Sequence, residues 1–114
     1  MHVFIGISHI IAGVIIILVC IPLIRGSVKM NTSYGIRFRQ SYASEKAWYA
    51  INRYGGIQFV IFSALLVLIG ILLLCIPVRT GSLAFWLSLF APLIMLVPAV
   101  TAFIFARQFG KTDM

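Results

Sequence analysis

Side chains that could perform acid–base or metal chemistry are scarce in this chain of 114 residues. The acidic residues are Glu45 and Asp113, and the histidines are His2 and His9. Two acidic residues leave almost no carboxylates for general acid–base catalysis or for binding a hard metal ion. The histidines match no metal-ligand pattern, and the chain has no plausible Ser/His/Asp set. We therefore predict a protein that is not an enzyme and that uses no metal and no cofactor.

His9 is the one titratable side chain, apart from the thiols, that lies well inside a long apolar run. An ionisable residue within a membrane is by default a hypothesis for a functional site. Alternatively, a neutral imidazole could donate a hydrogen bond to a neighbouring helix and have a purely structural role. Both interpretations of this intramembrane polar site stay open on the sequence.

Most other polar side chains lie in the segment 25–56, which is long for a loop without its own structure. Its first part contains the turn formers Asn31 and Gly35 on either side of Tyr34. Since Asn and Gly readily adopt turn conformations, this part predicts a folded turn that presents Tyr34 and Arg37.

The second part of the segment has a helical pattern. Ser44 suits the N-cap of a helix, and Glu45 suits its positively polarised first turn. Apolar residues then recur at three- and four-residue spacing, with Trp48 as an aromatic at the level of the lipid headgroups. We predict a short amphipathic helix at the membrane interface, followed by a turn at Gly55 and Gly56.

Membrane helices are the elements that must position these side chains. Apolar residues make up 62% of the chain and charged residues 10%, and the mean hydropathy is +1.12. A soluble domain is typically about 45–50% apolar and about 25% charged. Three apolar runs without a charged residue reach the length of about 20 residues that a membrane span requires. We predict an all-α integral membrane protein, one module over residues 1–114, with spans at about 3–24, 57–78 and 83–106.

The distribution of basic residues predicts the orientation of these spans. The net charge is +7, which in a soluble protein would suggest a nucleic-acid partner. In a membrane protein, basic residues collect in cytoplasmic loops beside anionic lipid, so we expect no nucleic-acid partner here. Only Arg79 lies between the second and third runs. The others lie between the first two runs or in the tail: Arg25, Lys29, Arg37, Arg39, Lys46, Arg53, Arg107 and Lys111. We therefore expect the N-terminus outside, and the segment 25–56 and the C-terminus in the cytoplasm.

Small side chains at helical spacing predict the faces on which the spans pack. The third run carries the longest stripe: Ala84, Ser88, Ala91, Met95, Pro98, Ala102 and Ala106. Shorter stripes are Gly6, His9 and Gly13 in the first run, and Ser63 and Gly70 in the second. Pro92 and Pro98 should bend the third run, either as static kinks or as the lining of a path for substrate.

The segment 25–56 also contains a motif of defined order and spacing. It reads Asn31-x-x-Tyr34-Gly35-x-Arg37, followed by Ser44-Glu45-x-x-Trp48-x-x-x-Asn52-Arg53-x-Gly55-Gly56. This motif resembles the signature of the SdpI/YfhL family, whose namesake is the immunity protein for the sporulation-delaying peptide toxin. The flanking apolar runs fit the small membrane module of that family. The resemblance implies a location in the bacterial inner membrane.

The resemblance further implies that the motif residues form a polar site near the cytoplasmic membrane surface: Asn31, Tyr34, Gly35, Arg37, Glu45, Trp48, Asn52 and Arg53. Within this site, Glu45 could pair with Arg37 or Arg53. Asn31 and Asn52 could hold the turn against the helix. Such a cap on the bundle could bind a ligand, or it could be structural and bind none.

The function that the resemblance implies is immunity. The protein would bind a membrane-active peptide toxin, or exclude it from lipid, without chemistry. Membrane lipid and a peptide toxin are the expected partners, and a homo-oligomer is plausible because three spans are few for a cavity. The alternative is a small oligomeric transporter or exporter, in which the proline-bent span and His9 would line the path.

Overall fold

The computed structural model of the protein describes residues 1–113, with side chains for residues 1–109. The four α-helices are α1 (His2–Arg25), α2 (Glu45–Cys75), α3 (Leu83–Leu89) and α4 (Leu96–Asp113). Two short 3₁₀ helices are η1 (Arg39–Tyr42) and η2 (Ala91–Met95). Within the described residues, three helical stretches are long and apolar enough to cross a membrane: His2–Arg25, Glu45–Cys75 and Ala91–Phe109.

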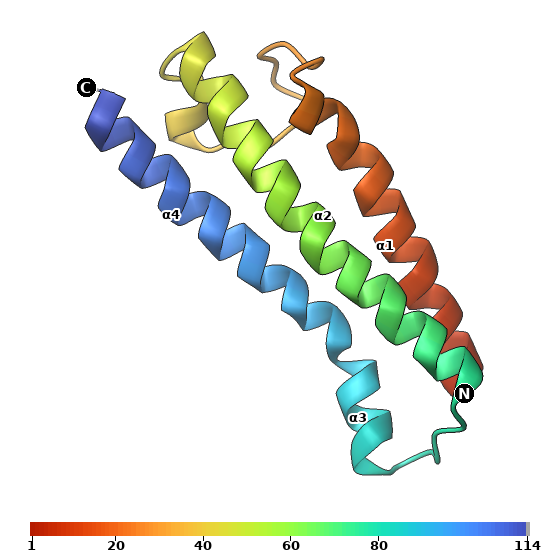
Figure 1. Cartoon of the computed structure of the whole chain (residues 1–114). Coiled ribbons are helices and arrows are strands. Elements are labelled where there is room, and N and C mark those ends of the chain that lie inside the picture. Colours follow the sequence, from red (N-terminus) through yellow and green to blue (C-terminus); the bar gives the residue numbers. More distant parts are fainter. Residues whose placement is uncertain (114) are drawn as a thin grey trace.

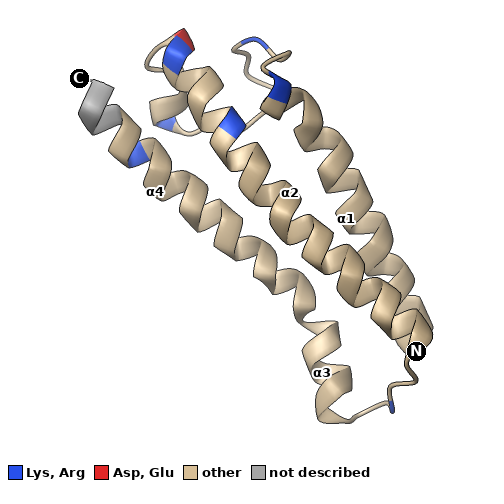
Figure 2. Ribbon diagram, in the orientation of Figure 1, with Lys and Arg blue, Asp and Glu red and all other residues tan. Residues whose placement is uncertain are grey.

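Helix α2 is the central element of an elongated molecule of 53 × 24 × 19 Å (Figure 1). Helix α1 packs along one side of α2 and helix α4 along another, while α3 lies at the end of the molecule where α1 begins. Residues 27–44, which we call the cap, fold at the opposite end, between the end of α1 and the start of α2. Lys and Arg gather at the cap end (Figure 2).

The short amphipathic helix predicted between the first two spans is not a separate element. Helix α2 begins at Glu45, after the predicted N-cap Ser44, whose side chain accepts a hydrogen bond from the Ala47 N–H at 3.0 Å. It then continues through Gly55 and Gly56 into the span, so the predicted turn there is wrong. A glycine inside a helix costs only about 1 kcal/mol relative to alanine. An uninterrupted helix keeps every backbone hydrogen bond, which outweighs that cost.

Both ends of the connection between α2 and α4 differ from the predicted spans. Helix α2 stops at Cys75 rather than near residue 78, because Ile76 precedes Pro77 and is extended, with φ −114° and ψ 119°. The third run is interrupted at Phe90, after which Ala91 and Pro92 open η2. The bend predicted for this run is therefore confirmed near Pro92. Pro98 lies in the first turn of α4, where a helix tolerates proline.

The small residues mark the packing faces as predicted. Ser88, Ala91, Pro98, Ala102 and Ala106 are buried, whereas Ala84 is exposed. The closest approach joins α1 to α2, where Gly6 and Gly70 face each other. A Cβ atom on Gly6 would lie 2.7 Å from the Gly70 carbonyl oxygen, and one on Gly70 would lie 2.6 Å from the Gly6 carbonyl oxygen. The backbones meet so closely that any side chain at either position must push the helices apart.

Candidate functional site: the polar cap

Asn52 is the residue on which the cap is anchored to α2. Its side chain is only 1% exposed. Its Oδ1 accepts a hydrogen bond from the Ile36 N–H at 2.6 Å, and its Nδ2 donates to the Trp48 carbonyl at 2.9 Å and to the Ile36 carbonyl at 3.4 Å. The amide thus pairs with both backbone polar groups of one cap residue. The prediction that Asn52 holds the turn against the helix is confirmed.

Gly35 and Trp48 fit around this anchor. Gly35 has a φ of +123°, which favours glycine, and a Cβ atom there would lie 2.9 Å from Asn52 Oδ1 and 3.0 Å from the Trp48 ring. Trp48 is completely buried, and its indole N–H donates to the Val28 carbonyl at 2.9 Å. Trp48 is therefore an internal support of the cap and not a headgroup-level aromatic.

Asn31 and two tyrosines shape the outer part of the cap. The Asn31 Oδ1 accepts hydrogen bonds from the N–H groups of Ser33 at 2.8 Å and Tyr34 at 2.6 Å, which closes a tight turn. The Tyr34 hydroxyl donates to the Val19 carbonyl of α1, and the Tyr42 hydroxyl donates to the Asn31 carbonyl at 2.7 Å. Asn31 builds the turn itself, so the prediction that it holds the turn against the helix is wrong for this residue. Tyr34 ties the turn to α1.

The charged residues of the motif do not pair as predicted. Arg37 donates to the Thr32 carbonyl within the cap, and the Arg53 Nε donates to the Ile24 carbonyl at 3.1 Å. Glu45 is exposed and makes no ion pair with the residues that the structure describes, so its predicted pairing with Arg37 or Arg53 is wrong. Ile24 lies in the last turn of α1, where carbonyls have no partner within the helix. A positive charge at the C-terminal end of a helix also interacts favourably with the helix dipole. Arg53 therefore binds the end of α1 in place of the predicted ion pair with Glu45.

Two apolar residues that were not predicted to belong to the site also fasten the cap. Ile36 packs against α2 at Gly55, where a Cβ atom would lie 2.2 Å from Ile36 Cδ1. Phe38 packs edge-on against Phe103 of α4, with ring centroids 5.4 Å apart. Both join a core that contains Ala47, Ile51 and Ala106. The signal was the alternation of Ile36 and Phe38 with two arginines, which places the apolar side chains on one face of an extended segment.

An open groove of about 670 Å³ lies where the cap meets α2 and α4. The cap contributes apolar walls through Ile36 and Phe38, α2 contributes Phe59, and α4 contributes Ala99. Arg37 also lines this groove, and it is the exposed cation of the motif on this side of α2. We call it the cap groove.

Comparison with known protein families matches the SdpI/YfhL protein family over residues 27–106. This match covers the cap, all of α2 and most of the third span. The chain belongs to the SdpI/YfhL family. No curated protein and no solved structure matches this SdpI/YfhL chain.

The SdpI/YfhL motif resolves into two groups of residues. The first group shapes and anchors the cap through contacts with backbone atoms or with each other: Asn31, Tyr34 and Gly35 in the cap, and Trp48 and Asn52 in α2. Arg37, Glu45 and Arg53 remain exposed. Any ligand of this SdpI/YfhL protein that binds at the motif must therefore meet mainly the second group.

His9 lies far from this motif, near the end of the bundle where the SdpI/YfhL chain begins. It is 5% exposed, and its Nε2 lies 2.7 Å from the Ser88 carbonyl oxygen of α3. Since a carbonyl only accepts, Nε2 carries the proton. In an uninterrupted helix this carbonyl would accept from residue 92, which is proline and has no N–H. The Ser88 carbonyl still accepts one backbone N–H at the C-terminal end of α3, so His9 adds a second donor where Pro92 offers none.

His2 repeats this arrangement one heptad earlier in α1. Its Nδ1 lies 2.6 Å from the Leu73 carbonyl oxygen, and the residue four positions after Leu73 is Pro77. Both histidines thus fasten α1 to a carbonyl that a proline leaves without its helical partner. This finding supports the structural interpretation of His9.

Substituting His9 separates the hydrogen bond from the packing of the ring. We expect His9→Leu to lower the free energy of unfolding by about 1 kcal/mol, the scale of interhelical hydrogen bonds in membrane proteins. His9→Gln keeps a donor at similar reach and should lose less than half of that. Thermal unfolding of both variants in detergent micelles measures the difference. Equal stability of the two would show that the bond contributes nothing.

Proposed function

We propose that this SdpI/YfhL protein is a non-catalytic immunity protein that binds a membrane-active peptide toxin or keeps it from the lipid. The family match over residues 27–106 carries this proposal, because the matched region contains the whole cap, all of α2 and most of the third span. The cap's own architecture supports it. An exposed arginine beside an apolar groove suits recognition of a peptide.

We further propose that the cap groove is where the toxin binds. Ile36, Phe38 and Phe59 give it apolar walls, and Arg37 supplies a positive charge on the same wall. An apolar peptide with a carboxylate or free carbonyl groups would complement both features. The five buried or half-buried motif residues would then act indirectly, because they hold the turn on which Arg37 lies.

Survival of a toxin-sensitive bacterium challenged with membrane-active peptides tests both proposals. Cells carrying the parent protein should tolerate more toxin than cells without it. Arg37→Gln should lower the tolerated concentration about tenfold, since a hydrogen bond to a charged group is worth about 1.5–3 kcal/mol. Ala99→Leu, which fills the cap groove from α4, should have a similar effect.

Two neighbouring substitutions serve as matched controls. Arg39→Gln removes the same charge two residues further on, and Val100→Leu enlarges an exposed side chain next to Ala99. Both should protect like the parent at equal expression. Full protection by Arg37→Gln and Ala99→Leu would move the binding site out of the cap groove. Failure of the parent to protect against any peptide would contradict the immunity function itself.

We also propose that the cap faces the cytoplasm of a bacterial inner membrane and that the N-terminus lies outside. Support comes from Arg79, which stands alone at the end opposite the cap, while the cap end carries Arg25, Lys29, Arg37 and Arg53 (Figure 2). Such asymmetry is typical of the positive-inside rule.

The native thiols make this orientation testable. Cys75 is exposed near the end opposite the cap, whereas Cys20 is buried. An impermeant maleimide added to spheroplasts should label Cys75 as completely as it does after lysis, and Cys75→Ser should abolish labelling. Labelling that requires lysis would reverse the proposed orientation.

A further inference from the structure

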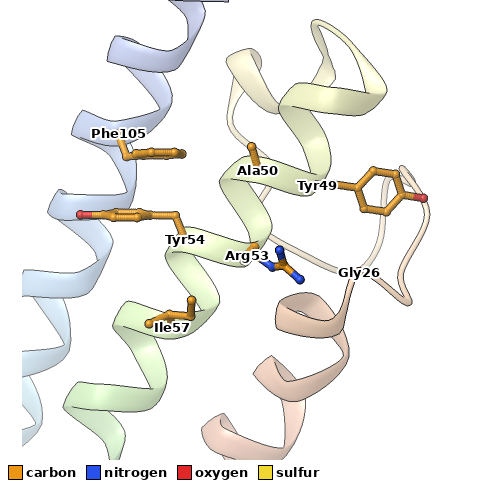
Figure 3. Close-up of a pocket in the computed structure, with 7 residues that line it drawn as sticks. All are labelled: Gly26, Tyr49, Ala50, Arg53, Tyr54, Ile57 and Phe105. Carbon is orange, nitrogen blue, oxygen red and sulfur yellow. The ribbon is translucent and has the colours of Figure 1, made fainter.

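A second groove lies on the face of α2 opposite the cap (Figure 3). It is open, has a volume of about 630 Å³, and is bounded by Gly26 at the end of α1 and by Phe105 of α4. Helix α2 contributes the other lining residues: Tyr49, Ala50, Arg53, Tyr54 and Ile57. Tyr54 stacks on Phe105 with ring centroids 4.2 Å apart, which closes the side toward α4. We call this the α2 groove.

Arg53 gives the α2 groove a fixed positive charge. Its Nε is held by the Ile24 carbonyl at 3.1 Å, so the guanidinium has a defined position at the end of α1. Its two terminal amino groups have no hydrogen-bond partner among the described residues, and the side chain is exposed. Arg25, the last residue of α1 and the one that follows Ile24, is exposed as well. The local field therefore favours an anion, and a guanidinium fork suits a phosphate.

Below Arg53 the same face of α2 is apolar and open. Ile57, Ile61, Leu65 and Leu68 follow at spacings of four, four and three residues, and each is at least 40% exposed. Eleven residues at 1.5 Å each extend about 16 Å along the helix. This length is close to one leaflet, about half of a 30 Å hydrocarbon core. An amphipathic ligand with an anionic head and an apolar chain would match charge and surface together.

We propose that the α2 groove binds one anionic phospholipid, with the phosphate on Arg53 and an acyl chain along Ile57 to Leu68. This site is separate from the cap groove and does not depend on the immunity function. A second copy of the chain is a less suitable occupant. A symmetric dimer through this face would bring the basic ends of two copies together, and like charges there repel.

Native mass spectrometry of the protein in detergent micelles tests this site. We expect added phosphatidylglycerol to remain bound, and phosphatidylcholine with the same acyl chains to bind far more weakly. Arg53→Gln should lower the fraction carrying phosphatidylglycerol about five- to tenfold, given the usual strength of arginine–anionic lipid contacts. Arg39→Gln removes an equal charge from the cap and should leave that fraction unchanged.

A second variant keeps the test independent of the Arg53 contact with α1. Ile57→Trp fills the α2 groove at an exposed position without changing charge, and it should also displace phosphatidylglycerol. Several results would overturn the proposal: equal binding of phosphatidylcholine, equal losses in Arg53→Gln and Arg39→Gln, or no loss in Ile57→Trp. Displacement of the lipid by inorganic phosphate at the same concentration would indicate a phosphate-ion site. A dimer that Ile57→Trp disrupts, without bound lipid, would assign the face to a second copy.

Discussion

Asn52→Leu should release the cap from α2. The substitution keeps the approximate volume of the side chain but leaves the Ile36 N–H and carbonyl without the partners that Asn52 provides. Each buried polar group left unpaired costs about 1–3 kcal/mol, so we expect the cap to lose about 2–4 kcal/mol of local stability. The protein should still insert and keep its three spans, because the packing of α1 on α2 is untouched.

Limited proteolysis measures this release directly. Arg37 and Arg39 are exposed trypsin sites on the cap, and cleavage there should follow the population of the detached cap. A loss of 2 kcal/mol corresponds to about a thirtyfold faster cleavage in detergent micelles. Gln40→Leu is the matched control, because Gln40 is half-buried in the cap and its side-chain amide makes no hydrogen bond with the described residues. Equal cleavage rates for the two variants would show that Asn52 does not anchor the cap.

Gly70→Val should weaken the bundle itself. A Cβ atom at this position would lie 2.6 Å from the Gly6 carbonyl oxygen and 3.2 Å from the Ile10 backbone nitrogen. Backbone atoms cannot rotate away as a flexible side chain can, so α1 and α2 must separate along their contact. Overpacking of this kind costs about 1–3 kcal/mol, and we expect the upper end of that range.

Thermal unfolding followed by circular dichroism in micelles checks this prediction. Ala64→Val is the matched control, since it adds the two γ-methyl groups of valine at an exposed position of the same helix. It should change the melting temperature little. A Gly70→Val protein as stable as Ala64→Val would mean that the helices do not approach each other through Gly6 and Gly70.

These two variants distinguish the two proposed binding sites, the cap groove and the α2 groove. Asn52→Leu should lose toxin protection while it retains lipid in the α2 groove, because the cap groove depends on the position of Ile36 and Arg37. Gly70→Val should impair both, since α1 bounds the α2 groove through Gly26 and receives the Arg53 contact at Ile24. The cap groove thus depends on both the cap and the helix bundle, whereas the α2 groove depends on the bundle alone.

Local chemistry in the sequence was enough to predict most of the architecture. Uncharged apolar runs indicated three membrane helices, because each span must satisfy its backbone polar groups internally and cover itself with apolar side chains. Ser44 and Glu45 indicated where α2 begins, because a cap acts on N–H groups only a few residues away. The small residues of the third run indicated its packing face, and the motif indicated the family.

Only the tertiary structure decided which distant groups meet. Ile36 and Ile24 pack against α2 at Gly55 and Gly56, in the space that side chains would otherwise occupy. The partner of Arg53 is a carbonyl 29 residues away rather than a nearby carboxylate, and that of His9 is a carbonyl 79 residues away. Such pairings depend on helix crossings and on backbone carbonyls, which are present at every residue. The sequence shows which side chains can donate a hydrogen bond, but only the folded chain decides which carbonyl each donor reaches.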